Sequence, residues 1–322
     1  MTAVGSPTTS RKPGTTGSRP GHAAPRRPRR GRGSGLPWLL SLPALILLIG
    51  VLGYPLYWMV QLSFKDLGLR QLFSGEPAPW VGFQQYSEIL KDPQFWTVVW
   101  HTAAFTVVSV LLTLVLGLAI ALLMRRVHRS VRIAMIVAMM FVWALPQLVQ
   151  AQAFRWITDA NFGILNHVLG SSFQGHSWFA STIQGWIVIT TLVVWAGIPF
   201  LAITLNAGLT QVPKELLEAA TVDGATPWQA LRGITLPILK PLITIVTTLS
   251  VIWNFGLFTQ VWVLRDSKPE DGFQTLATYS YSQAFGESKY SPGSAISVIT
   301  VVLLLGVMVL YIRQMFKIGD VD

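Results

Sequence analysis

The sequence contains no cysteine and few charged residues. The first absence excludes disulfides, thiolate metal sites, iron–sulfur clusters and cysteine nucleophiles. Only 12% of the residues are charged and 52% are hydrophobic, whereas a typical soluble domain has about 25% charged residues. This composition predicts that most of the 322-residue chain lies in a lipid bilayer.

Apolar runs long enough to cross a membrane make up much of the sequence. A transmembrane helix needs about 20 apolar residues, and a β-barrel would instead show short alternating segments. We therefore predict an all-α polytopic membrane protein with about six transmembrane helices. The expected spans are residues 36–63, 96–124, 132–154, 182–209, 238–264 and 293–312.

Acidic residues are missing from all the expected spans, which argues against two classes of membrane protein. Ion-coupled carriers normally need an intramembrane carboxylate, and membrane-embedded glycosyl or phosphoryl transferases need acids, His or metal ligands at defined spacing. The five His residues are scattered. No phosphate-binding G-x-x-x-x-G-K-[ST] loop occurs, so an ATPase is not expected on this chain. We expect no catalytic residue, no metal site and no bound cofactor; an enzyme and a carrier remain the alternatives.

Basic residues concentrate at the N-terminus. Residues 1–35 hold eight basic residues, no acid and many Pro, Gly, Ser and Thr, which predicts a disordered cytoplasmic tail before a transmembrane domain over residues 36–318. Contact with anionic lipid is favoured over nucleic-acid binding. With the N-terminus inside, cytoplasmic segments hold 17 Lys and Arg residues against 7 outside. The positive-inside rule therefore predicts that both termini are cytoplasmic.

A polar stretch, residues 211–237, interrupts the hydrophobic sequence before the fifth expected span. Pro213 is expected at the first position of a short helix. That helix is expected to end at Gly224, because glycine adopts a positive φ at little cost.

A second short helix is expected directly after this glycine. Thr226 is the expected N-cap, with Pro227 at the first position and Gln229 completing a capping box. Pro237 is expected to mark the start of the fifth span. Two helices joined by a glycine corner predict a rigid cytoplasmic projection that transmits force from a soluble partner, and an interfacial amphipathic connector is the alternative.

The same stretch resembles the EAA signature of ABC-importer permeases. EAA at residues 218–220 is followed after three residues by Gly224, and after nine more by the I-x-L-P sequence at residues 234–237. The resemblance implies the type I ABC-importer permease fold, with this stretch as a coupling helix that docks on an ATPase. The residues that it assigns to coupling are Glu218, Ala219, Ala220, Asp223, Gly224, Thr226, Pro227, Trp228, Ile234, Leu236 and Pro237.

Three further segments are similar to sugar permeases of the maltose-system type: residues 81–110, 145–169 and 276–299. The resemblance extends over residues 36–318. It implies a permease subunit that imports an oligo- or disaccharide across the bacterial cytoplasmic membrane. The implied partners are a second permease subunit, two ATPase subunits that carry ATP and Mg²⁺, an extracytoplasmic binding protein and membrane lipid; nucleic acid is not among them.

Uncharged polar and aromatic side chains within spans are what a sugar site requires, since amides bind hydroxyls and ring faces pack on C–H surfaces. Interhelical hydrogen bonding would use the same amides in any helix bundle, and Trp residues near span ends also serve as interface anchors. The candidate pathway residues are Trp253, Asn254, Gln260, Gln152 and Asn206, with Gln147 and Gln150 as further candidates.

Overall fold

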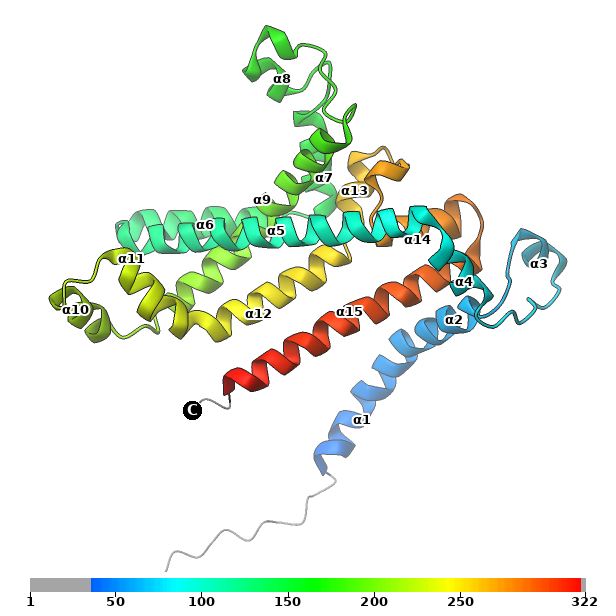
Figure 1. The fold of residues 1–322 in the computed structure, drawn as a ribbon, viewed down its shortest axis with the longest axis horizontal. Coiled ribbons are helices and arrows are strands. Elements are labelled where there is room, and N and C mark those ends of the chain that lie inside the picture. Colours follow the sequence, from blue (N-terminus) through cyan, green and yellow to red (C-terminus); the bar gives the residue numbers. More distant parts are fainter. Residues whose placement is uncertain (1–35, 320–322) are drawn as a thin grey trace, which may run out of the picture. The chain divides into compact units, whose positions relative to one another are not determined.

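The computed structural model describes residues 36–319, and its regular elements are helices throughout this range (Figure 1). The predicted disordered tail, residues 1–35, lies outside the described residues, as do residues 320–322. Two compact units are present, one ending at Leu52 and the other beginning at Gly53.

The described part of the first unit is helical. Helix α1 (Leu36–Leu48) passes into a π-helical turn, η1 (Ile49–Gly53). From Leu40 onward its apolar side chains are exposed, with 73% of Leu40 and 68% of Leu47 accessible. A helix that is apolar on every side and exposed is typical of a segment that faces lipid.

The second unit contains the remaining helices. Its α-helices are α2 (Tyr54–Ser63), α3 (Leu69–Ser74), α4 (Gln84–Lys91), α5 (Pro93–Arg126), α6 (Arg129–Ala144), α7 (Gln147–Ile157), α8 (Ile164–Leu169), α9 (Thr182–Leu209), α10 (Lys214–Val222), α11 (Pro227–Ala230), α12 (Leu236–Phe255), α13 (Thr259–Leu264), α14 (Leu276–Tyr281) and α15 (Tyr290–Gly319). Its short 3₁₀ and π segments are η2 (Ser171–Phe173), η3 (Leu231–Thr235), η4 (Asp271–Phe273) and η5 (Ser282–Gly286).

The long helices α5 and α9 pack along one another at the centre of this unit. Gly117 lies at a close contact of the two helices, since a Cβ placed there would stand 2.9 Å from the Cβ of Leu201. Small residues at such positions let membrane helices approach closely, and packing then stabilises the pair. Figure 1 shows α10 and α11 at one end of these helices and α14 toward the other.

Most of the predicted spans are confirmed. Helices long and apolar enough to cross a membrane cover Leu40–Ser63, Pro93–Arg126, Thr182–Leu209, Pro227–Phe255 and Tyr290–Val309. The bent pair α6–α7 adds a sixth crossing if it is counted as one span. The all-α polytopic prediction is therefore confirmed.

The third expected span, residues 132–154, is not one straight helix. Helices α6 and α7 meet at 97° across Leu145 and Pro146. Leu145 has an extended backbone (φ −66°, ψ 132°), because the ring of a following proline disfavours the helical conformation of the residue before it.

The fifth expected span, residues 238–264, is also broken. Helix α12 ends at Phe255 with Gly256 as its C-cap, and α13 starts only at Thr259. Residues 259–264 therefore belong to a separate short helix. In the opposite direction the helix extends further than expected, back to Pro227.

Candidate functional site

The glycine corner predicted in the polar stretch is present. Helix α10 ends at Val222, and Gly224 has φ of 79°, a conformation that L side chains rarely adopt. The amide of Gly224 donates to the carbonyl of Thr221 at 3.1 Å, and the amide of Ala225 donates to that of Ala220 at 2.9 Å. This pair of bonds is a Schellman motif, which satisfies the last carbonyls of the helix and fixes the exit direction of the chain.

The predicted cap of the next helix is present as well. The Thr226 hydroxyl accepts from the backbone amide of Gln229 at 3.3 Å. The Gln229 side chain in return accepts from the backbone amide of Thr226 at 2.7 Å. This reciprocal capping box satisfies two donors that the first helical turn would leave free.

Two prolines of the stretch lie elsewhere than expected. Pro213 is the N-cap residue of α10, and Lys214 takes the first helical position. Pro237 does not separate α11 from the fifth span: the helix continues through the π-helical turn η3 into α12, where Pro237 lies in the first turn. A π-helical turn changes the local hydrogen-bond pattern. The helix can therefore continue past Pro237, although proline has no N–H group to donate.

The outer face of α10 and α11 is exposed. Glu218, Ala219 and Asp223 are exposed, as is 87% of Val222 and 66% of Trp228. The residues nearer to α12 are less accessible: Ala220, Ile234 and Leu236 are half-buried. The projection thus presents carboxylates and large apolar side chains on a frame whose corner and cap are fixed by backbone bonds, an arrangement suited to docking a partner.

A cavity of about 580 Å³ lies at the two helix breaks. Residues on both sides of the α6–α7 break and of the α12–α13 break line it, together with one face of α9. Broken helices that surround a cavity are a frequent arrangement at membrane substrate sites. The lining residues are Thr113, Trp143, Leu145, Gln147, Gln150, Val193, Ala196, Gly197, Phe200, Leu201, Ser250, Ile252, Trp253, Asn254, Gly256, Leu257 and Gln260.

Three amide side chains of this cavity carry buried oxygens without a partner among the described residues: Gln150 Oε1, Asn254 Oδ1 and Gln260 Oε1. Two of the amides are held by their nitrogens. Gln150 Nε2 donates to the carbonyls of Val142 and Leu145, and Asn254 Nδ2 donates to that of Ser250 at 2.7 Å. Since carbonyls only accept, the side-chain oxygens must point away from them. A buried acceptor without a donor is costly, so these oxygens are suited to a ligand that brings donors.

Aromatic rings form part of the cavity wall. Phe200 packs edge-on against Trp253 with centroids 5.1 Å apart, and its ring is stacked on that of Trp143 at 6.4 Å. No lining residue is charged. The cavity therefore offers hydrogen-bond acceptors and ring faces without a net charge, which fits a neutral ligand with both hydroxyl groups and C–H surfaces.

The structure brings together part of the predicted pathway set. Trp253, Asn254 and Gln260 line the cavity, as do Gln147 and Gln150. Two predicted residues, Gln152 and Asn206, are half-buried and do not line it.

Sequence reasoning missed the aromatic residues Trp143 and Phe200, which also line the cavity. Pro146 and Gly256 were the available signals. A Pro- or Gly-interrupted pair of hydrophobic segments marks where membrane helices break, and binding sites concentrate there.

A network of side chains holds the segments next to the cavity. Helices α7 and α13 pack together, and Arg155 pairs with Asp266 just beyond α13. The guanidinium of Arg265 lies over the rings of both Phe179 and Phe273, 4.8 and 4.7 Å from their centroids.

Arg265 also affects a carboxyl group in the loop that follows. Its Nε donates to Glu270 Oε2 at 2.8 Å, and this hydrogen bond holds the pKa of the Glu270 carboxyl below its ordinary value, although burial opposes the shift. In the loop after α7, the Asp159 carboxylate accepts the backbone amides of Phe162 and Asn161, which lower its pKa likewise.

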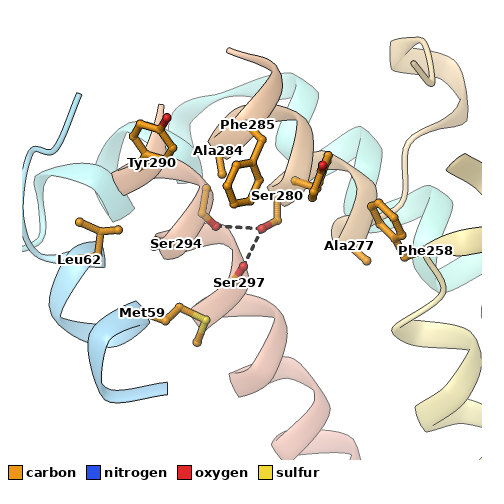
Figure 2. Close-up of a pocket in the computed structure, with 12 residues that line it drawn as sticks. Met59, Leu62, Phe258, Ala277, Ser280, Ala284, Phe285, Tyr290, Ser294 and Ser297 are labelled. Atoms are coloured by element: carbon orange, nitrogen blue, oxygen red, sulfur yellow. Dashed lines mark hydrogen bonds between the residues drawn. The ribbon is translucent and has the colours of Figure 1, made fainter. Parts of the chain in front are cut away.

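A second cavity, of about 420 Å³, lies between α2, α14 and α15 (Figure 2). Met59 and Leu62 close one side of it. The Ser280 hydroxyl donates to the Gly293 carbonyl at 2.9 Å and lies 2.6 Å from the Ser297 hydroxyl, which can then donate to it. Ser280 and Ser297 thus already have hydrogen-bond partners in the protein. This cavity therefore indicates a ligand less strongly than the cavity at the two helix breaks, where acceptors are free.

Metal binding finds no support in the described part of the chain. No group of three or more His, Asp or Glu side chains there could hold a metal ion.

Comparison with known proteins identifies relatives over most of the sequence. Residues 113–317 match the family described as "Binding-protein-dependent transport system inner membrane component". The diacetylchitobiose uptake system permease protein DasB of Streptomyces coelicolor is 36% identical over 88% of each chain. The sulfoquinovosyl glycerol transport system permease protein SmoG of Agrobacterium fabrum is 33% identical over 85% of this chain and 88% of that protein.

A solved structure shares the fold. A bacterial ABC transporter involved in the import of the acidic polysaccharide alginate superimposes with a TM-score of 0.70 at 20% identity, over 88% of this chain and 95% of that chain. The agreement confirms the expected ABC-importer permease fold.

Proposed function

Because this chain belongs to the family of binding-protein-dependent transport system inner membrane components, we propose that it forms the translocation path of an importer for a neutral oligo- or disaccharide. The family assignment itself makes the chain a multi-pass permease component of an ABC importer in the cytoplasmic membrane. In such importers the ATPase is a separate subunit and a binding protein delivers the substrate. The chain is thus a permease component and not an enzyme.

The cavity at the two helix breaks is the observation that carries the proposal. Its three free amide oxygens can accept hydrogen bonds from sugar hydroxyls, and its aromatic rings can pack against the C–H faces of a pyranose. A cationic or anionic substrate would find no counter-charge among the lining residues. At about 580 Å³ the cavity is within the usual range for small-ligand sites.

The substrates in the names of the relatives indicate a carbohydrate. They are diacetylchitobiose, sulfoquinovosyl glycerol, trehalose or maltose, and galactooligosaccharides. All of them are glycosides or short sugar chains, which supports a carbohydrate for this permease. Sulfoquinovosyl glycerol carries a sulfonate, so the proposed neutrality of the substrate rests on the uncharged lining of the cavity and not on these names.

A second permease subunit is expected to complete the site. Trp143 and Trp253 belong to the cavity wall, yet 57% and 52% of their side chains are accessible in this chain alone. Half-exposed Trp side chains next to buried amides support a partner helix that closes the open side.

The polar stretch is the proposed contact with the ATPase. Its residue pattern resembles the EAA signature of the family's coupling helix, and its exposed Glu218, Asp223 and Trp228 are available to a soluble partner. We place this stretch and both termini in the cytoplasm, on the basis of the distribution of Lys and Arg along the sequence.

Uptake by the complete importer in proteoliposomes tests the substrate class. We expect ATP-dependent accumulation of a labelled neutral di- or oligosaccharide, and none of amino acids or of an acidic oligosaccharide of equal length. Equal uptake of the acidic sugar, or transport of amino acids only, would refute the proposal. Each substrate should be tested together with the importer's own binding protein, because that protein also discriminates between substrates.

A further inference from the structure

A third cavity, of about 380 Å³, lies between the ends of α5 and α9 and the elements α10, α11 and η3. These three elements belong to the polar stretch of residues 211–237, which is named the coupling stretch from here on. Two of its lining residues are basic, Arg125 and Arg126 in the last turn of α5, and no carboxylate lines it. Most of the others are apolar. The full set is Leu122, Arg125, Arg126, Leu209, Val212, Leu217, Thr221, Ala225, Pro227, Ala230, Leu231 and Thr235.

Both arginines lack a counter-ion in the part of the chain that the structure describes. The ion pairs found there join other residues, and no hydrogen bond engages either guanidinium. Arg125 is half-buried at the cavity edge. Basic side chains in a last helical turn interact favourably with the helix dipole, but that role does not require them to line a cavity.

We propose that this cavity binds a phosphate-bearing anion, with the phosphate between Arg125 and Arg126. Guanidinium groups bind phosphate through paired, charge-assisted hydrogen bonds. The leucine-rich remainder of the lining would hold the apolar part of the ligand, as a glycerophospholipid has next to its headgroup. Basic pockets between membrane helices on the cytoplasmic side are known to bind anionic headgroups.

The location gives such a ligand a consequence for transport. Thr221, Ala225 and Pro227 line the cavity and belong to the corner and cap of the coupling stretch. A bound anion would therefore connect the end of α5 to the coupling stretch. Phospholipid and free phosphate share the same chemistry, so the experiment must separate them. The consequence for transport rests on the proposed coupling role of this stretch, whereas binding of the anion itself does not.

Retention of anionic lipid tests the proposal directly. The complete importer is assembled in nanodiscs of phosphatidylcholine with phosphatidylglycerol, extracted in mild detergent, and analysed by native mass spectrometry. We expect wild type to retain phosphatidylglycerol and the double variant Arg125→Gln/Arg126→Gln to retain at least about tenfold less, because two phosphate contacts are lost. The matched control is Arg129→Gln/Arg232→Gln, which removes two exposed arginines outside the cavity.

A second arm uses inorganic phosphate without phosphatidylglycerol. Thermal stabilisation of wild type but not of the double variant by millimolar phosphate, with no difference in lipid retention, would identify free phosphate as the source. Equal lipid retention together with equal phosphate response in wild type and double variant would overturn the proposal. An equal loss of retained phosphatidylglycerol in the control variant would also overturn the proposal, since lipid retention would then depend on the total positive charge and not on this cavity. The charge-preserving variant Arg125→Lys/Arg126→Lys should restore much of the binding.

Discussion

Gln150 donates from its Nε2 to the carbonyl oxygen of Leu145 at 3.1 Å. The same nitrogen donates to the carbonyl of Val142 at 3.2 Å, and that carbonyl also accepts the backbone amide of Leu145 at 3.3 Å, so one side chain binds two carbonyls at the end of α6. Its oxygen is left free in the cavity. The same side chain therefore binds the end of α6 at the break and presents the free acceptor.

Replacing Gln150 by Glu should destabilise the protein, because a carboxylate cannot donate to the two carbonyls and brings charge into an uncharged cavity. We expect a loss of about 1–3 kcal/mol in the free energy of unfolding, seen as a lower Tm of the detergent-solubilised importer. Gln152→Glu is the matched control, as Gln152 does not line the cavity. Equal shifts for both variants would contradict the assigned role of Gln150.

The free oxygens of Asn254 and Gln260 should matter for transport. Asn254→Ala or Gln260→Ala is expected to weaken apparent sugar affinity by roughly three- to tenfold, since one hydrogen bond contributes about 0.5–1.5 kcal/mol. The apparent affinity is measured from uptake into proteoliposomes as a function of sugar concentration. Asn206→Ala provides a sharp control, because the Asn206 oxygen is also buried without a partner but lies outside the cavity. If Asn206→Ala weakens affinity as much, the loss reports packing and not contact with sugar.

The corner at Gly224 should tolerate side chains according to backbone preference. No atom would lie within 4 Å of an added Cβ, so the strain comes from φ alone. Gly224→Val should cost about 1–3 kcal/mol locally, and Gly224→Asp less through the backbone, because Asp visits positive φ more readily. Substrate-stimulated ATPase activity should fall in the order wild type, Asp, Val, with unchanged membrane insertion. Gly233→Ala, at a helical glycine with open surroundings, is the control. Full coupling in Gly224→Val would remove the proposed role of the corner.

Lowering the pH should remove the contribution of the Arg265–Glu270 pair to the free energy of unfolding. The pKa of Glu270 is lowered in the folded protein by its hydrogen bond from Arg265. The pair therefore stabilises the fold at pH values above the ordinary pKa of a glutamate, and this contribution is lost as the pH falls through the lowered folded value. The effect is small, about 0.2–1 kcal/mol, because more than half of the Glu270 side chain is exposed.

Glu270→Gln provides the measurement. Its Tm should lie below that of wild type at pH 7, and the gap should narrow steadily toward pH 3. A gap that is constant across this range would show that the Glu270 carboxylate contributes nothing through its charge.

The coupling stretch could be predicted from sequence in detail because its signals are local. Gly224 and Thr226 act through backbone conformation within a few residues, and both occupy the expected positions. Pro237 did not act as expected, since the helix passes it through a π-helical turn. Such a turn depends on how the helix packs along its whole length, which no short pattern encodes.

The cavity was only partly predictable. Amides within apolar spans stand out, which is why Asn254 and Gln260 could be chosen. The aromatic residues could not, because the same residue types anchor helices at the membrane interface. Gln152 and Asn206 carry the same polar groups as the cavity residues and lie on two of the same helices, α7 and α9, but at positions that do not line the cavity. Which positions of a helix line a cavity is decided by tertiary packing.

The helix that begins at Pro227 and ends at Phe255 has a mechanical consequence. At about 1.5 Å per residue, its 29 residues form a rod that carries Trp228 of the coupling stretch at one end and Asn254 of the cavity at the other. A push or a twist applied at the first is delivered to the second without crossing a loop. The π-helical turn at Leu231–Thr235 sets the phase between the two ends. Removing one residue from that turn would rotate one end relative to the other by about 100°. The coupling stretch and the cavity would each stay folded, but their relative orientation would be wrong for transmitting the movement.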